Sequence, residues 1–431
     1  MREPSQHAGF SILQRMSHPG GPQEVLVLGD YRQTVTAVRS LARAGFAVIL
    51  GTSVRRSSTA LSRHVSEVWR YGRADSRSFC DELESFLRVR KPAFVLPLGE
   101  SQLRPVIREA ARLEPLSCWA MPEPETAARC LDKRALYALT PTLGIPTPAS
   151  RVFTTEQDWR REAATMGFPV VVKRKDSSAQ VCNRKAMILR TAPELDEFLR
   201  DVGSDPDRRS LVLQKFAAGT RHNCHVAAAD GRLTAYFEQK VIRTDELDDT
   251  GIGVAGASVA PSPELRGYCE RLLLALRYTG IGCIQFLVDG ARAAFLELNP
   301  RMDSTAMLPY RLGLDFPLFA IELAAYRRAR NMGLDGTGAL REPSALEAPY
   351  PVGKRYHWLC GDLGAWIECL RRRRQRPREL ATWALDMLWR SALDSHLTWD
   401  VLDPLPTLHM FWKKYGLIAL PRPPRARLRQ A

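Results

Sequence analysis

The sequence of 431 residues lacks the features of several common protein classes. Its nine cysteines include no Cys-x-x-Cys pair and no His/Cys spacing typical of zinc ligands, and their number is odd. We therefore expect reduced thiols in a cytoplasmic protein rather than a disulfide framework or a zinc site. The N-terminal residues contain no continuous apolar core, and no window reaches the length of a membrane span. Neither a signal peptide nor a transmembrane helix is expected.

Common nucleotide-binding motifs are also missing. The first 125 residues contain no Gly-x-Gly-x-x-Gly motif, no Walker A sequence occurs anywhere, and there is no internal repeat. A dinucleotide-binding domain, a P-loop and a solenoid are therefore not favoured.

Acidic residues are fewer than basic ones, with 47 Asp and Glu against 62 Lys and Arg, and the formal net charge is +15. Such a balance suits nucleic acid, an anionic membrane or anionic small molecules. The basic clusters at 371–376 and 422–429 have no interleaved aromatic residues and no helix-turn-helix or zinc-finger pattern around them. A nucleic-acid partner is thus not expected, and solvated helix ends explain the clusters better.

What the sequence does contain begins after a leader at 1–21 rich in Pro, Gly and Ser. Apolar runs at 24–28 and 46–50 flank a helix-like stretch at 34–44, and a third run lies at 93–98. This alternation predicts an open α/β domain at 22–125, with ligands expected at the carboxyl ends of its strands.

A β-hairpin is predicted at 282–299. Two apolar runs, 282–286 and 294–298, flank Asp289-Gly290, a sequence typical of tight turns. In the second strand Glu297 and Asn299 must point to the same face, because side chains alternate along a strand.

Together with Gln285 on the partner strand, Glu297 and Asn299 would form an oxygen-rich site suited to Mg²⁺ or Mn²⁺. Arg301 follows directly and adds a positive charge where a phosphate or carboxylate could bind. The solvated face of an ordinary surface hairpin is the alternative interpretation.

Five motifs follow one another in a fixed order: Asp132-Lys133, Gly-Ile-Pro-Thr-Pro at 144–148, Phe-Pro-Val-Val-Val-Lys at 168–173, Leu-Gln-Lys-Phe-x-x-Gly at 213–219 and Glu-x-Asn-Pro-Arg at 297–301. Over about 125–325 this series resembles the ATP-grasp superfamily, especially the carbamoyl phosphate synthase large subunit. The resemblance implies a mixed α/β and α+β protein with an N-terminal open α/β (pre-ATP-grasp) domain. A two-lobed ATP-grasp domain would follow at 126–330, with its small lobe at about 140–215, and then a basic, mainly helical region at 331–431.

The resemblance also implies roles for individual residues. Lys173 would bind the nucleotide phosphates with the help of Lys133, and Arg301 would stabilise the transferred group or a substrate carboxylate. Gln214, Lys215 and Phe216 would form the hinge that binds adenine, and His222 would contact the ribose. The metal ligands would be Gln285, Glu297 and Asn299. Two departures from the family pattern are Gln214, where Glu is common, and a phosphate loop at 174–180 without glycine.

The function implied is that of an ADP-forming ligase, which activates a carboxylate with ATP and Mg²⁺ for attack by an amine. Its substrates are not named by the sequence, and their contacts are expected near 99–101 and 302–310. A non-catalytic ATP-binding protein stays open as an alternative, as does a homodimer.

Docking of the C-terminal region on a membrane or partner is a further alternative. One set of residues there follows helical spacing beside Trp389, and such a stripe is more typical of a core than of a membrane surface. The set comprises Leu380, Trp383, Ala384, Met387, Leu388 and Ser391.

Overall fold

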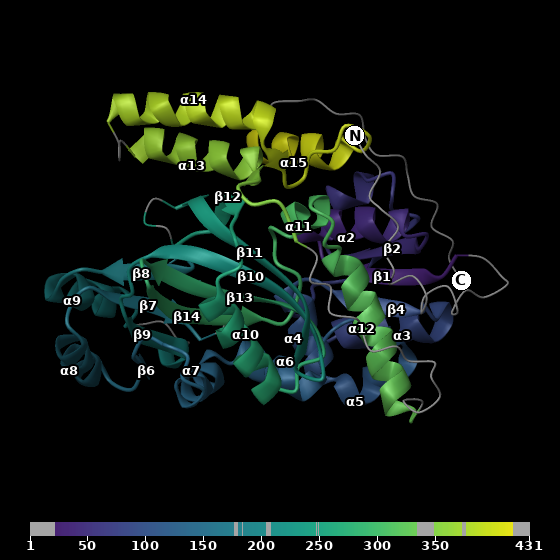
Figure 1. Cartoon of the computed structure of the whole chain (residues 1–431), viewed down its shortest axis with the longest axis horizontal. Coiled ribbons are helices and arrows are strands. Elements are labelled where there is room, and N and C mark those ends of the chain that lie inside the picture. The colour runs from purple at the N-terminus through teal and green to yellow at the C-terminus, as the bar shows by residue number, and fades with distance from the viewer. Residues whose placement is uncertain are drawn as a thin grey trace.

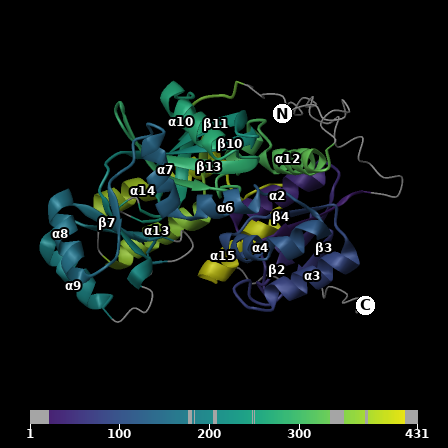
Figure 2. The same ribbon diagram turned by 90° about the horizontal axis from the view of Figure 1, so that it is seen from below.

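The computed structural model describes residues 22–175, 180–182, 184–203, 208–246, 248, 250–333, 349–372 and 376–416. These residues form a parallel sheet, a small antiparallel sheet and a large, mostly antiparallel sheet, with helices packed against them (Figure 1). The leader, the cluster at 422–429 and residues 176–179 of the phosphate loop lie outside the described residues. Viewed from below, the small sheet lies on one side of the molecule and the parallel sheet on the other, with α6 and α7 between them (Figure 2).

The N-terminal sheet is entirely parallel, as the strand-helix-strand pattern predicts. Its strand order is β3 (Glu67–Arg70), β2 (Ala47–Thr52), β1 (Glu24–Leu28), β4 (Phe94–Pro97) and β5 (Cys118–Trp119). The accompanying helices are α2 (Arg32–Arg43), α3 (Phe79–Arg90), α4 (Glu100–Arg108) and α5 (Ala110–Leu113), with 3₁₀ turns at Thr59–Leu61 and Glu114–Leu116. The strands β3 and β5 were not predicted, because one is partly exposed and the other has two residues.

The small sheet is antiparallel, and helices cover one of its faces. Its order is β6 (Ser150–Val152), β9 (Leu211–Lys215), β7 (Val170–Arg174) and β8 (Ala186–Leu189), with α8 (Glu156–Met166), α9 (Ala192–Asp201) and a 3₁₀ turn at Arg208–Ser210. Val170, Val172 and Leu213 pack in the core that includes Trp159 and Phe198 of these helices. Because side chains alternate along a strand, the residues between these positions face away from α8 and α9.

The large sheet runs in the order β14 (Arg292–Asn299), β13 (Gly280–Asp289), β10 (Thr220–Ala229), β11 (Arg232–Thr244), β12 (Gly253–Ser258), β15 (Arg355–His357) and β16 (Ser395–His396). The helix α10 (Pro263–Ala275) covers one face and packs on Cys224 and Val226. The helix α12 (Phe316–Asn331) packs on the other face against Ala227 and Ile281. Three further helices, α6 (Pro124–Leu131), α7 (Lys133–Thr142) and α11 (Met307–Arg311), complete this part of the chain.

The C-terminal region is mainly helical, as predicted, but it also adds β15 and β16 to the large sheet. Its helices are α13 (Leu359–Arg372), α14 (Pro377–Leu393) and α15 (Leu405–Tyr415). None of the described helices is both long and apolar enough to cross a membrane. The fold class predicted from the sequence is confirmed.

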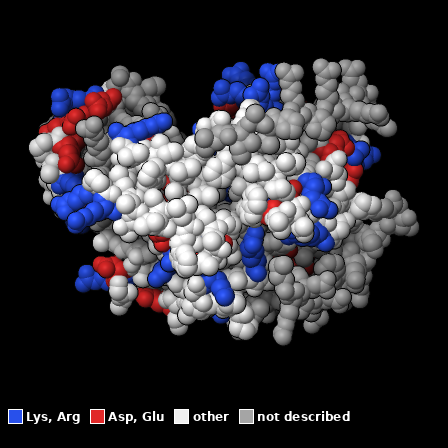
Figure 3. All heavy atoms as spheres, turned by 90° about the horizontal axis from the view of Figure 1, so that it is seen from above, with Lys and Arg blue, Asp and Glu red and all other residues white. Residues whose placement is uncertain are grey.

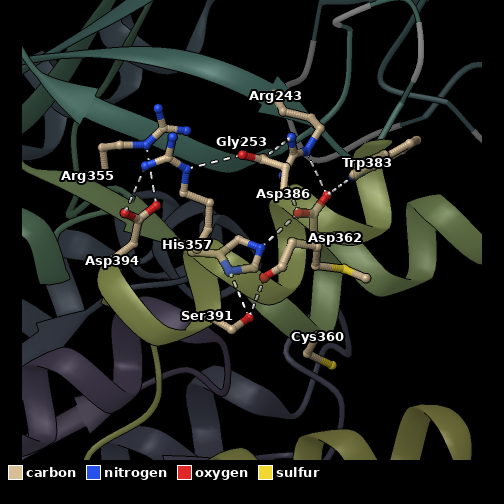
Figure 4. Close-up of polar contacts among 12 residues, drawn as sticks. Arg243, Gly253, Arg355, His357, Cys360, Asp362, Trp383, Asp386, Ser391 and Asp394 are labelled. Atoms are coloured by element: carbon tan, nitrogen blue, oxygen red, sulfur yellow. Dashed lines mark hydrogen bonds and ion pairs between the residues drawn. The ribbon is translucent and has the colours of Figure 1, made fainter. Parts of the chain in front are cut away.

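A buried charge cluster joins the C-terminal helices to the large sheet (Figure 4). Arg243 of β11 binds Asp362 of α13 with Nε at 2.8 Å from Oδ1, and its Nη1 lies 3.1 Å from Asp386 of α14. His357 of β15 lies 2.8 Å from the same Asp362 carboxylate, and Trp383 donates its indole N–H to it. Burial alone would raise the pKa of Asp362, but the hydrogen bonds from His357 and Arg243 lower it overall. Removing one partner would leave a buried charge unpaired, so the cluster fixes the helices to the sheet.

Candidate active site between two sheets

The predicted hairpin is present as β13 and β14, and Gln285 lies directly opposite Glu297. Glu297 and Asn299 share a face, and the Asn299 side-chain amide donates to Glu297 Oε1 at 2.8 Å. This bond directs the amide N–H of Asn299 toward the carboxylate and leaves its carbonyl oxygen for another partner. One carboxylate and two amides on one face fit a hard cation that also binds substrate phosphates.

Lys133 lies beside the carboxylate of this hairpin. The Asp132 side chain accepts a hydrogen bond from the backbone N–H of Arg134 and so caps α7, whose first residue is Lys133. The Lys133 ammonium is buried and lies 3.5 Å from Glu297 Oε2. The cap therefore fixes a cation at the edge of the predicted metal site.

Lys173 reaches the same place from the small sheet. It alternates with Val170 and Val172, so it points away from α8 and α9, and its Nζ donates to Tyr137 Oη at 2.6 Å and Gln214 Oε1 at 2.8 Å. Burial lowers the pKa of Lys173 to about 8, against the attraction of the Glu297 charge. The lysine is thus held by neutral oxygens beside a carboxylate, which suits it to an incoming anion.

Tyr137 links the two sheets and was not predicted as a site residue. Its hydroxyl accepts from Lys173 and donates to the Leu296 carbonyl of β14 at 2.8 Å. Its ring packs edge-on against Phe295. Tyr137 therefore positions the lysine of one sheet against the hairpin of the other.

Arg301 follows the hairpin and directs an Nη1 donor to the Met302 carbonyl at 3.2 Å. Its Nε is buried and has no hydrogen-bond partner among the described residues. The pKa of Lys185, before β8, is lowered chiefly by desolvation. The nearby charge of Glu297 opposes this shift, and the charge of Arg301 adds to it. Lys185 was not predicted as a site residue, because it lies outside the matched motifs.

The predicted nucleotide contacts Lys215, Phe216 and His222 make their hydrogen bonds to residues outside the cluster around Glu297. Lys215 donates to the Met166 and Gly167 carbonyls, and the Phe216 backbone N–H donates to Pro169 at 3.4 Å. His222 pairs with Glu238 at 2.7 Å on the α10 side of the large sheet, the face opposite Gln285. The structure therefore brings together the predicted phosphate and metal residues, while the roles of the hinge residues and of His222 stay predictions.

A row of polar residues extends the Gln285 face across five strands. The residues are directly paired in the order Glu297, Gln285, Asn223, Gln239 and Ser258. Asn223 Oδ1 and Gln239 Oε1 are buried and have no hydrogen-bond partner among the described residues. Buried amides usually have partners, so this row is suited to a polar ligand beside the metal face.

Comparison with known proteins places this geometry in context. No family model matches the chain. Two carbamoyl phosphate synthase large chains from strains of Thermus thermophilus are 28% and 26% identical to it, over 47% and 71% of this chain. The chain spans only 20% and 29% of the length of those two relatives.

The similar solved structures are carboxylases and a synthetase. A biotin carboxylase from Campylobacter jejuni in complex with β,γ-ATP has a TM-score of 0.60 at 14% identity, covering 77% of this chain and 74% of that one. The biotin carboxylase domain dimer of Hydrogenobacter thermophilus 2-oxoglutarate carboxylase, in complex with MgADP, ADP and bicarbonate, has a TM-score of 0.59 at 16% identity, over 70% and 69%. The chain has the ATP-grasp fold. The N5-carboxyaminoimidazole ribonucleotide synthetase of T. thermophilus, with a TM-score of 0.54 at 19% identity over 70% and 77%, agrees with this assignment.

Proposed function

We propose that the protein is a cytoplasmic, ADP-forming ligase, which activates a small carboxylate as an acyl phosphate for attack by an amine. The observation that carries this proposal is the convergence of Lys133 and Lys173 on Glu297 from different elements. Such an arrangement places cations and a metal-binding carboxylate around one point, as phosphoryl transfer requires.

In this proposal Gln285, Glu297 and Asn299 hold Mg²⁺ or Mn²⁺, which neutralises phosphate charge. Lys173 and Lys133 orient the phosphates, and Arg301 stabilises the charge that develops on the transferred group. The polar row from Gln285 to Ser258 would orient the substrates beside the metal face. A screen of small carboxylates and amines for substrate-stimulated ADP release tests the proposal, and ATP binding without any stimulated release would favour the non-catalytic alternative.

Mg-ATP is expected to stabilise the protein against heat, because a ligand that binds only the folded state raises stability by mass action. At about 100 times the dissociation constant the gain is about 2.7 kcal/mol. A thermal melt with Mg-ATP, compared with Mg²⁺ alone, measures it. No shift, together with no heat of binding by calorimetry, would contradict nucleotide binding altogether.

Mg-ATP binding is also expected to take up protons near pH 8. The pKa of Lys173 is about 8 in the free protein, and nearby phosphates raise the pKa of an ammonium group. Well below pH 8 Lys173 is charged in both states, so proton uptake and a fall in affinity set in as the pH approaches 8 and grow above it. Calorimetry in two buffers of different ionisation enthalpy measures the uptake. Lys173→Met should lose it and bind more weakly, whereas Lys413→Met, exposed at the end of α15, should match wild type.

A further inference from the structure

The helix α14 carries an apolar stripe that remains exposed when the helix packs against the rest of the described chain. Leu380 and Met387 are buried and form the inward stripe, which agrees with the core interpretation of these two positions. The core interpretation is wrong for Leu388 of the same predicted stripe, because its side chain is 67% exposed. Four large side chains lie on a second stripe, in which Leu388 and Trp389 are three and four residues after Leu385 and Leu393 is four after Trp389, and each is more than 60% exposed. They are Leu385 at 68%, Leu388 at 67%, Trp389 at 64% and Leu393 at 61%.

This stripe lies on an outer surface of the molecule, since α14 is the outermost element above α13 in Figure 1. Figure 3 looks onto that side and shows a broad area with few charged side chains, with both basic and acidic residues at its edges. Monomeric proteins rarely expose contiguous apolar patches without a partner. The stripe therefore needs an occupant.

The charge around the helix favours an anionic occupant. Residues 351–431 contain 15 Lys and Arg against 7 Asp and Glu, which is more than half of the net charge of +15 in less than a fifth of the chain. Five of those seven carboxylates pair with arginines of the sheets or of α2: Asp362, Asp386, Asp394, Asp400 and Asp403. Arg371, Arg376 and Arg378 are exposed where α13 ends and α14 begins. These three arginines therefore place exposed positive charge where α13 and α14 meet.

We propose that α14 docks on an anionic lipid surface. Its stripe enters the boundary between headgroups and acyl chains, and Arg371, Arg376 and Arg378 contact lipid phosphates. An interfacial helix combines these features: leucine and tryptophan on one face and arginine beside it. A second copy of the chain fits less well, because a stable interface needs about 20 to 30 residues from each partner and two such regions would repel each other.

Flotation of the full-length protein with vesicles tests this proposal. The protein should float with phosphatidylcholine vesicles that contain phosphatidylglycerol, much less with phosphatidylcholine alone, and less as salt is raised. The double variant Leu388→Glu/Trp389→Glu should bind at least about tenfold more weakly, because two side chains lose their apolar burial. Leu274→Glu is the matched control, since Leu274 of α10 is 62% exposed, and it should bind like wild type.

Three results would overturn the proposal. The first is that the protein does not float with anionic vesicles, and the second is that the double variant floats as well as wild type. The third is that wild type does not float but forms a dimer, which the double variant converts to a monomer. The last result would assign the stripe to a second copy. Since both replaced side chains are exposed, the melting temperature of the double variant should match that of wild type, and this measurement confirms that lost binding is not lost folding.

Discussion

Glu297→Gln is expected to abolish ligase turnover while the fold persists. Glu297 is the carboxylate of the predicted metal set, and the replacement keeps its shape but removes the negative charge that faces the cation. Its side chain is 23% exposed, but its partner Lys133 is buried at a distance of 3.5 Å. The replacement leaves a buried ammonium without its carboxylate, so the melting temperature should fall although the fold persists. Loss of metal-assisted charge neutralisation should lower the rate at least about a thousandfold.

The measurement is substrate-stimulated ADP release, with a thermal melt to check the fold. Glu270→Gln is the matched control, because Glu270 is an exposed carboxylate that pairs with Arg266 on α10, the helix on the face of the large sheet opposite Gln285. It should retain full activity. Retention of full activity by Glu297→Gln would show that β13 and β14 do not hold the metal, whatever the fate of nucleotide binding.

The hairpin could be predicted because its pattern is local. Two apolar runs around Asp289-Gly290 fix the turn, and the alternation of side chains then fixes the shared face of Glu297 and Asn299. The N-terminal parallel sheet was predictable for a similar reason, since each long strand is a continuous apolar run such as Val25 to Leu28.

The polar row could not be predicted, because register is a property of the paired strands. Asn223 faces Gln285 across 62 residues of sequence, and nothing near either residue specifies that pairing. The same limit applies to His222: a family motif gives its position along β10 but not the neighbours on its face, where Glu238 binds it. Sequence patterns thus located the residues that are predicted to bind metal and phosphate, whereas their surroundings depend on tertiary pairing.

The second apolar stripe of α14 was missed for a different reason. Apolar residues occupy more than half of the helix circumference, so helical spacing alone supports several stripes. Only contact with α13 and the sheet decides which of them is buried. The prediction of a core position was therefore correct for Leu380 and Met387 and wrong for Leu388, which is exposed together with Leu385 and Trp389.

Arg301→Lys is expected to lower the turnover rate by about two to three orders of magnitude, with much less effect on the apparent Michaelis constant for ATP. Pro300 limits the backbone before Arg301. The Arg301 guanidinium donates from Nη1 to the Met302 carbonyl, and its buried Nε has no partner among the described residues. N–H donors therefore remain for a substrate anion. Lysine keeps the charge but loses the planar pair of donors that matches a phosphate or carboxylate.

The test follows oxygen-18 from a labelled carboxylate substrate in wild type and Arg301→Lys, with Arg292→Lys, exposed at the other end of β14, as control. An acyl-phosphate route must transfer one labelled oxygen into the released phosphate, because the carboxylate oxygen attacks the γ-phosphorus and stays on it when the amine displaces phosphate. Arg301→Lys should transfer the label at the reduced rate, and Arg292→Lys at the normal rate. Unlabelled phosphate, or AMP and pyrophosphate in place of ADP, would contradict the acyl-phosphate mechanism even if Glu297 proves essential, since a metal-bound nucleotide also serves adenylate chemistry.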